Sequence, residues 1–382
     1  MELYVHIPFC RKKCRYCAFV SYADKEAEYE NYIGLILDEA GQRHTEANEP
    51  VTTVYIGGGT PSLLPSALLS ALVRGLDGIL DLGAVKEFTV EANPGTVTAE
   101  WMDAAAALGV NRLSFGMQAR QDRLLHLLGR IHQFEEVAAS VQLARRAGIT
   151  NLNLDLIFGI PAQTMAEWEE TLDAALSLNP SHLSAYGLIP EQGTPLCEDL
   201  EQGRLSLPDP DTERKMYDTV KLKTAEQGLF QYEVSNFARP GSECMHNIGY
   251  WTQVPYLGLG VSAASMTGVH SGKAGFTCVR SVNPDTLEAY EDAVRNRRRP
   301  ASELIRPPEA RFETMMLGLR MNRGVSERDF ARMHGVPLDQ CYGEKMRMLE
   351  QRGLLLHTGG AWKLTDRGFD IQNSILVELL ED

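Results

Sequence analysis

The arrangement of apolar segments in the first half of the chain limits the possible folds most. Six short apolar segments that are typical of strands alternate with five segments whose apolar residues have helical spacing. The predicted strands cover 3–7, 51–56, 87–91, 112–117, 151–158 and 182–189, and the predicted helices cover 27–43, 65–76, 98–108, 134–147 and 165–178. Strands linked by helical crossovers form a parallel sheet with helices on its faces. The sequence therefore predicts an α/β fold, and the pattern alone allows either a doubly wound sheet or a barrel.

Three closely spaced cysteines follow the first predicted strand. Cys10, Cys14 and Cys17 lie on one loop, and the next cysteine is Cys197. Thiolates hold iron–sulfur clusters, and a four-iron cluster bound by three thiolates keeps one iron open for another ligand. Two other interpretations remain open, a zinc site with His6 as fourth ligand and a thioredoxin-type dithiol of Cys14 and Cys17 that leaves Cys10 without a role. The three-thiol spacing favours the cluster.

Polar residues and glycines gather where the predicted strands end. The glycine-rich segment 57–61 follows the second strand, so its backbone can approach a ligand, although it lacks the lysine of a phosphate-binding loop. Glu91 and Gln118 end the third and fourth strands, and Asp155 lies within the fifth. A carboxylate in an apolar strand is costly unless it is paired, so Asp155 either forms a buried ion pair with Arg130 or faces a ligand. The ends of these strands are therefore the predicted binding site.

A family resemblance accounts for these features together. Residues 4–10, with the sequence YVHIPFC, followed by Cys14, Tyr16 and Cys17, resemble the opening of the HemN/HemW family of radical S-adenosylmethionine (SAM) proteins. The resemblance implies a partial six-stranded (β/α) barrel, a [4Fe-4S] cluster on Cys10, Cys14 and Cys17, and SAM on the open iron, where an electron from the cluster cleaves SAM to a 5′-deoxyadenosyl radical. The positions that it assigns to SAM contact are Tyr4, Tyr16, Gly58, Gly59, Thr60, Glu91, Gln118, Arg130, Asp155 and Ile189.

Two features place the resemblance within the family. The coproporphyrinogen III oxidases of the family (HemN) have a fourth cysteine two residues after the third, where this chain has Phe19, and a longer extension before the first strand. The segment 246–251, HNIGYW, resembles the heme-binding motif of the heme chaperones of the family (HemW). This implies heme as cargo, with His246 as the candidate iron ligand and with Tyr250 and Trp251 packed on the macrocycle. A purely structural, hydrogen-bonded histidine is the alternative role of His246.

The resemblance predicts a radical-SAM-type heme chaperone that delivers heme to heme-requiring respiratory proteins and works with an electron donor. It implies SAM cleavage without coproporphyrinogen oxidase activity. The alternative is an oxygen-independent coproporphyrinogen III oxidase or another radical SAM enzyme that acts on a tetrapyrrole. Residues 258–266, GLGVSAASM, favour this alternative, because they resemble the oxidases more than the chaperones. A third hypothesis is a metal-free binding module whose cysteines are only structural.

The sequence after the barrel predicts two further structural segments. We expect the barrel with the cluster loop over 1–235, an irregular wrapping segment with the heme motif over 236–305, and a winged-helix-like, helix-rich domain over 306–382. The segments behind this division are a helix over 207–227, a strand over 231–235, a glycine-rich stretch over 235–260, helices over 309–321, 326–333 and 339–352, a hairpin over 354–364 and a last helix over 366–380.

The composition narrows the choice of partners and compartment. The formal net charge of -14 excludes a general nucleic-acid binder, since phosphate contacts need a basic surface. We expect no signal peptide and no transmembrane segment, and seven cysteines without paired spacing indicate a reducing cytoplasm. The basic run 295–299 is interpreted as a solvated helix end, and its alternative role is peripheral contact with anionic lipid.

Overall fold

Six parallel strands form the centre of the fold in the computed structural model, which describes residues 1–47, 49–270 and 275–380. They are β1 (Glu2–Ile7), β4 (Thr53–Gly58), β5 (Glu87–Ala92), β6 (Arg112–Gln118), β7 (Asn151–Phe158) and β8 (His182–Gly187). They lie side by side in chain order, and each neighbouring pair is parallel. A doubly wound sheet would reverse its strand order at one point. The predicted partial (β/α)6 barrel is therefore confirmed.

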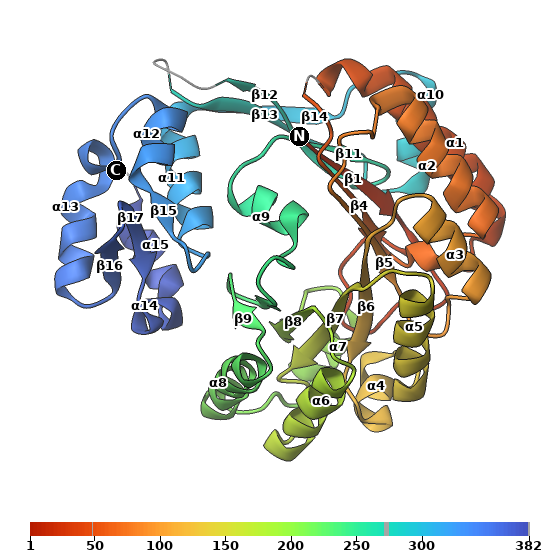
Figure 1. Ribbon diagram of the computed structural model, residues 1–382, viewed down its shortest axis with the longest axis horizontal. Helices are drawn as coiled ribbons and strands as arrows, with labels where there is room; N and C mark the ends of the chain where they lie inside the picture. The colour runs from red at the N-terminus through yellow and green to blue at the C-terminus, as the bar shows by residue number, and fades with distance from the viewer. Residues whose placement is uncertain (48, 271–274, 381–382) are drawn as a thin grey trace.

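Helices cover the outer face of this curved sheet (Figure 1). The predicted ones are α1 (Tyr29–Arg43), α2 (Ser66–Leu80), α3 (Ala99–Ala107), α5 (Phe134–Arg146), α6 (Met165–Ser177) and α8 (Pro210–Glu226), and two short helices, α4 (Asp122–Leu128) and α7 (Pro195–Glu201), were not predicted. Their starts follow local chemistry. The side chain of Thr164 caps α6 while Glu167 bonds back to the cap residue, which satisfies N–H groups that lack helical partners.

Most described residues between 236 and 270 and between 275 and 305 lie in helices and strands, so the prediction of an irregular segment is wrong. This part of the chain contains β10 (Asn236–Ala238), α9 (Met245–Trp251), β11 (Tyr256–Leu259), β12 (Ala264–His270), β13 (Thr277–Val282), α10 (Leu287–Arg295) and β14 (Ala301–Ile305). β11 pairs in parallel with β1, and β12, β13 and β14 continue the sheet in antiparallel order. The predicted strand over 231–235 is also wrong, because those residues mostly form the turn between β9 (Phe230–Gln231) and β10.

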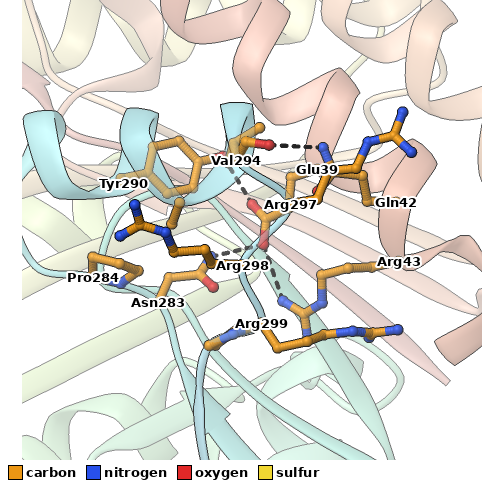
Figure 2. Close-up of a pocket in the computed structure, with 12 residues that line it drawn as sticks. Glu39, Gln42, Arg43, Asn283, Pro284, Tyr290, Val294, Arg297, Arg298 and Arg299 are labelled. Atoms are coloured by element: carbon orange, nitrogen blue, oxygen red, sulfur yellow. Dashed lines mark hydrogen bonds and ion pairs between the residues drawn. The ribbon is translucent and has the colours of Figure 1, made fainter.

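A buried carboxylate fixes this sheet extension to α1. Glu39 accepts hydrogen bonds from the hydroxyl of Tyr290 and the amide of Asn283, each at 2.8 Å, and it pairs with Arg43 at 3.0 Å (Figure 2). It also accepts a hydrogen bond from the backbone N–H of Gly260 at 2.9 Å. A buried carboxylate is stable only when it is paired in this way. The barrel and its extension are therefore joined by a polar contact as well as by strand pairing.

The basic run 295–299 lies at and beyond the carboxyl end of α10. Arg295 pairs with Glu291 at 2.7 Å, and Arg298 pairs with Asp292 at 2.8 Å. These exposed pairs agree with a solvated helix end, and lipid contact stays an untested alternative. Among the described helices, none combines the length and the apolar character that a membrane span needs.

The last part of the chain forms a separate helical module with a small sheet. It consists of α11 (Pro307–Gly318), β15 (Val325–Ser326), α12 (Glu327–His334), α13 (Leu338–Gln351), β16 (Leu355–Thr358), β17 (Ala361–Leu364), α14 (Asp366–Asp370) and α15 (Gln372–Leu379). The predicted hairpin is confirmed, with β17 between β15 and β16. The prediction of a single last helix is wrong, because the helix is interrupted at Ile371, between α14 and α15. Phe330, Tyr342 and Trp362 belong to the buried core of this module.

Candidate functional site

A cavity of about 550 Å³ opens at the carboxyl ends of the barrel strands. It brings together most of the residues that the sequence assigned to the cluster and to SAM. These are Cys10, Cys14, Tyr16, Cys17, Gly58, Gly59, Glu91, Gln118, Arg130, Asp155 and Ile189. Two assigned residues do not line it. Thr60 is buried behind Cys10, and Tyr4 lines two neighbouring cavities. We refer to this space as the cofactor cavity.

Cys10 is the last residue of β2 (Phe9–Cys10), and Cys14 and Cys17 lie on the loop of bends and turns between β2 and β3 (Tyr22–Ala23). All three are free and partly exposed, and burial raises the pKa of the Cys10 and Cys17 thiols. Two donors face the sulfurs. The hydroxyl of Thr60 lies 3.6 Å from Sγ of Cys10, and Nη1 of Arg130 lies 3.6 Å from Sγ of Cys14. Such donors stabilise the thiolate form that binds iron.

The alternatives of zinc and a dithiol fit this loop less well. Among the described residues, no three His, Cys, Asp or Glu side chains are arranged to hold a single ion. His6 is engaged at both ring nitrogens, by the hydroxyl of Tyr4 and the carbonyl of Val20, each at 2.9 Å. A thioredoxin-type dithiol would begin a helix, whereas Cys14 to Cys17 form a turn. A cluster spreads its thiolate ligands over several irons, so the residues present fit a cluster.

The glycine segment after β4 is needed for packing as well as for access. Gly58 has φ +108, and a Cβ on it would lie 2.4 Å from the ring of His6. A Cβ on Gly59 would lie 2.7 Å from the carbonyl oxygen of Phe9. Both positions require glycine because β1 and β2, which lead into the cysteine loop, approach this backbone so closely. Both also line the cofactor cavity, which leaves their backbone open to a ligand.

Glu91 presents a carboxylate to the cofactor cavity from the end of β5. It accepts hydrogen bonds from the hydroxyl of Tyr55 at 2.8 Å and from the N–H of Gly58 at 2.9 Å. Burial, followed by repulsion from Asp155, raises the pKa of Glu91 to about 7. A ligand with an ammonium group would favour the charged form of this carboxylate. The role of Tyr55 in the site was not predicted, because the sequence of a strand does not show which group a tyrosine hydroxyl will hydrogen-bond to.

Arg130 is held by a chain of hydrogen bonds that crosses three strand ends. Its Nη2 donates to Oδ1 of Asn93 at 2.7 Å and to the carbonyl of Gly116 at 2.8 Å. Nδ2 of Asn93 in turn donates to the hydroxyl of Thr60 at 2.7 Å. Asn93 thus connects the two side chains that face Cys10 and Cys14. Sequence reasoning missed Asn93, although its position two residues after Glu91 placed it at the same strand end.

Asp155 is satisfied by neutral donors and forms no ion pair with Arg130. The hydroxyl of Ser114 and the amide of Asn153 each donate to its carboxylate at 2.8 Å. Burial raises the pKa of Asp155. The arrangement leaves a carboxylate on the wall of the cofactor cavity, which suits ligand hydroxyls or cationic groups. The alternative role of Asp155 as the partner of Arg130 in a buried ion pair is therefore wrong.

Gln118 has an unusual backbone conformation at the end of β6. Its φ is +64, and the pairing register between β6 and β7 shifts at this point. Non-glycine residues with positive φ are strained and cluster at ligand sites. The same cavity wall carries Ile189, which is 70% exposed. Local sequence could not indicate the strain at Gln118, because it depends on the neighbouring strand.

His246, the candidate heme ligand, is buried with both ring nitrogens engaged. Nδ1 bonds to the hydroxyl of Thr53 at 2.8 Å and Nε2 to the hydroxyl of Tyr250 at 2.9 Å. The side chain is 2% exposed, and burial, followed by the charge of Arg112, lowers its pKa to about 3. Iron ligation by His246 would require one of these bonds to break. Trp251 is half-buried and lines none of the three cavities described for this region.

Comparison with known proteins agrees with the residues of this site. Residues 4–175 match the radical SAM superfamily, and residues 305–371 match the HemN C-terminal domain. The chain is 36% identical over 376 residues to the heme chaperone HemW of Bacillus subtilis (strain 168), which covers 97% of each chain. It is 33% identical to the heme chaperone HemW of Escherichia coli (strain K12), over 98% of this chain and 97% of that one.

Two further proteins extend the comparison. The chain is 33% identical to the bovine protein named radical S-adenosyl methionine domain-containing protein 1, mitochondrial, over 99% of this chain and 87% of that one. The solved structure of coproporphyrinogen III oxidase (HemN) from Escherichia coli superposes on this one with a TM-score of 0.83. The match has 23% sequence identity and covers 99% of this chain and 89% of that one. The last likeness concerns the fold alone. The identities to the chaperones, over nearly the whole length, together with the three-thiol loop above the barrel, establish that this chain belongs to the HemW family of radical SAM proteins.

Proposed function

We propose that this protein is a heme chaperone that binds a [4Fe-4S] cluster on Cys10, Cys14 and Cys17, SAM in the cofactor cavity, and heme as cargo. It acts in the cytoplasm, takes electrons from a donor protein and passes heme to heme-requiring respiratory proteins. The observation that carries the proposal is the placement of three free thiols beside a cavity lined by Glu91 and Arg130. The names of the relatives support heme as the cargo.

Each group of the cofactor cavity has a role in this proposal. The thiolates hold the cluster, and Arg130 and Thr60 donate toward two of the sulfurs, which offsets their negative charge. When bound, the cluster would supply single electrons to SAM held in the cofactor cavity. Glu91 offers a carboxylate to an ammonium group, and Asp155 offers acceptors to ribose hydroxyls.

Anaerobic reconstitution with iron and sulfide tests the proposal. We expect the wild type to bind four irons, to give an electron paramagnetic resonance signal that changes when SAM is added, and to bind one hemin (ferric protoporphyrin IX). The variant with Cys10, Cys14 and Cys17 all changed to alanine is the control for the cluster. Failure to assemble a cluster, or a cluster that does not respond to SAM, would remove the radical SAM part of the proposal.

A second assay separates the chaperone from the alternative enzyme. We expect the reconstituted protein with SAM and a reductant to form no protoporphyrinogen from coproporphyrinogen III, and to transfer bound heme to an apo-cytochrome. Turnover of coproporphyrinogen III would show that the protein is an oxidase. Absence of hemin binding in the wild type would remove heme as the cargo.

A further inference from the structure

A second cavity, of about 520 Å³, lies between the cluster loop, the sheet extension and α11 of the C-terminal module. Its volume is that of a site for an organic ligand. Most of its lining is apolar or aromatic, and the side chains that the argument uses are Phe19, Tyr250, Tyr256, Met266, Arg280 and Leu317. We refer to it as the extension cavity.

The floor of the extension cavity is a row of side chains on three neighbouring strands. Tyr256 of β11 is paired with Met266 of β12, and Met266 is paired with Arg280 of β13. Directly paired residues of antiparallel strands point to the same face of the sheet. The row therefore offers an aromatic ring, a thioether and a guanidinium along one line. Such a surface matches a flat apolar ring that carries an acidic arm at one side.

The guanidinium at the end of this row is held by carboxylates that a ligand can replace. Arg280 pairs with Glu313 of α11 at 2.7 Å and with Glu303 of β14 at 3.7 Å. The geometry with Glu313 uses two guanidinium nitrogens, which is how arginine binds a carboxylate. Because Glu313 also lines the extension cavity, a ligand carboxylate there would compete with it for Arg280.

The cavity wall also contains a polar group without a partner. Gln253 is 5% exposed and has φ +56, and its Nε2 has no hydrogen-bond partner among the described residues. Its Oε1, in contrast, accepts a hydrogen bond from the hydroxyl of Thr314. A buried amide nitrogen without a partner is costly, so an acceptor on a bound molecule would stabilise this conformation.

The extension cavity and the cofactor cavity share one wall. Ala18 and Phe19 line both, and Phe19 is 67% exposed. Phe19 stands at the position where the oxidases of the family resemblance have their fourth cysteine. A molecule in the extension cavity would therefore lie against Ala18 and Phe19 of the cysteine loop, whose other side faces the cofactor cavity.

His246 does not line the extension cavity. It lines a third, polar cavity of about 180 Å³ on the other side of Tyr250, and Tyr250 lines both. Of these two motif residues, which are hydrogen-bonded to each other at 2.9 Å, only Tyr250 therefore reaches the extension cavity.

We propose that the extension cavity is the heme site, with the macrocycle over Tyr256 and Met266 and a propionate on Arg280. This inference rests on the proposed function of heme carriage and assigns it to residues outside the predicted motif. The row of three strands supplies the flat floor, Arg280 supplies the charge that complements a propionate, and the shared wall puts the cargo beside the cluster loop.

Hemin titration of full-length protein tests the site. We expect Arg280→Met to weaken hemin binding roughly tenfold, as expected for loss of one charged hydrogen-bonded pair, and Glu313→Gln to tighten it by releasing Arg280. Leu317→Trp should reduce binding further, because a larger side chain occupies the cavity. The matched control is Arg332→Met, which removes an exposed arginine that pairs with Asp329 within its own helix. Thermal melts and SAM binding verify that each variant is folded.

Two probes distinguish the contacts. Hemin dimethyl ester lacks the propionate charges, so Arg280→Met should not change its affinity. His246→Ala should bind hemin as the wild type does. Hemin binding that is unchanged in both Arg280→Met and Leu317→Trp would overturn this site while leaving heme carriage intact. Loss of hemin binding in His246→Ala, with normal binding in the other two variants, would overturn it in the same way. Tighter binding of hexadecanoate than of hemin would overturn the assignment to a tetrapyrrole. No hemin binding by the wild type would instead remove the proposed function itself.

Discussion

Nη1 of Arg130 lies 3.6 Å from Sγ of Cys14, although 116 positions separate the two residues in the sequence. The rest of the guanidinium is fixed by Asn93 and by the carbonyl of Gly116. The positive charge is therefore held beside one of the three thiols and cannot move away to pair with a surface carboxylate.

Removing this charge should alter the reduction potential of a reconstituted cluster. Reduction adds negative charge, which Arg130 stabilises, so Arg130→Met should lower the potential by on the order of 50 mV. Potentiometric titration followed by electron paramagnetic resonance measures the change. Arg130→Lys keeps the charge and is the control. An equal potential in wild type and Arg130→Met would contradict the proposed placement of the cluster.

SAM binding should depend on pH through Glu91. The pKa of this carboxyl is raised to about 7, so it is mostly protonated at pH 6 and mostly charged at pH 8. Because an ammonium group binds the charged form, SAM affinity should fall about tenfold from pH 8 to pH 6. Calorimetry on the reconstituted protein measures it. Glu91→Gln should bind SAM weakly at both pH values, and a pH dependence that survives this substitution would exclude Glu91 as its cause.

Gly58→Ala should destabilise the fold strongly. The new Cβ would lie 2.4 Å from the ring of His6 at a backbone φ of +108, so we expect a loss of about 3 kcal/mol in the free energy of unfolding. Gly78→Ala is the matched control, since Gly78 lies within α2 with nothing within 4 Å of its Cβ position. That variant should gain up to about 1 kcal/mol from helix propensity. Urea denaturation measures the free energy of unfolding of both variants. Equal values for the two would contradict the predicted clash at Gly58.

His246 should stabilise the fold in a pH-dependent way. Its folded pKa of about 3 lies below the value of about 6.5 in an unfolded chain, so the stability that neutral His246 contributes is present above pH 6.5 and is lost as the pH falls from there toward 3.

Substitution of this histidine makes the effect measurable. His246→Ala should lose about 2 kcal/mol at pH 8, where two buried hydrogen bonds are removed, and clearly less at pH 5.5. Urea denaturation at the two pH values measures the difference. A destabilisation that grows toward low pH would show that His246 is charged in the folded protein.

The barrel could be predicted because its signals are local. Each strand of the six is a short apolar run, and each long helix repeats its apolar residues at helical spacing, so both can be recognised without knowledge of the partner. The short helix α4 was missed because its seven residues contain too few turns for a clear pattern.

The sheet extension could not be predicted because its strands depend on distant partners. Leu257 of β11 lies opposite Leu3 of β1, and Arg280 lies opposite Met266 in a hairpin that local spacing does not reveal. The candidate site shows the same division. Its cysteines and strand-end carboxylates follow from position in the chain, whereas the bonds of Asn93 exist only after the strand ends have met.

The pairing of β1 on both sides has a consequence for how the protein is made. β4 covers one edge of this strand, and β11, which ends at Leu259, covers the other. The strand that leads into the cysteine loop therefore lacks one of its two neighbours until translation has passed Leu259. Under the proposed function, a cluster bound before that point would be attached to a strand whose second edge is still open to water.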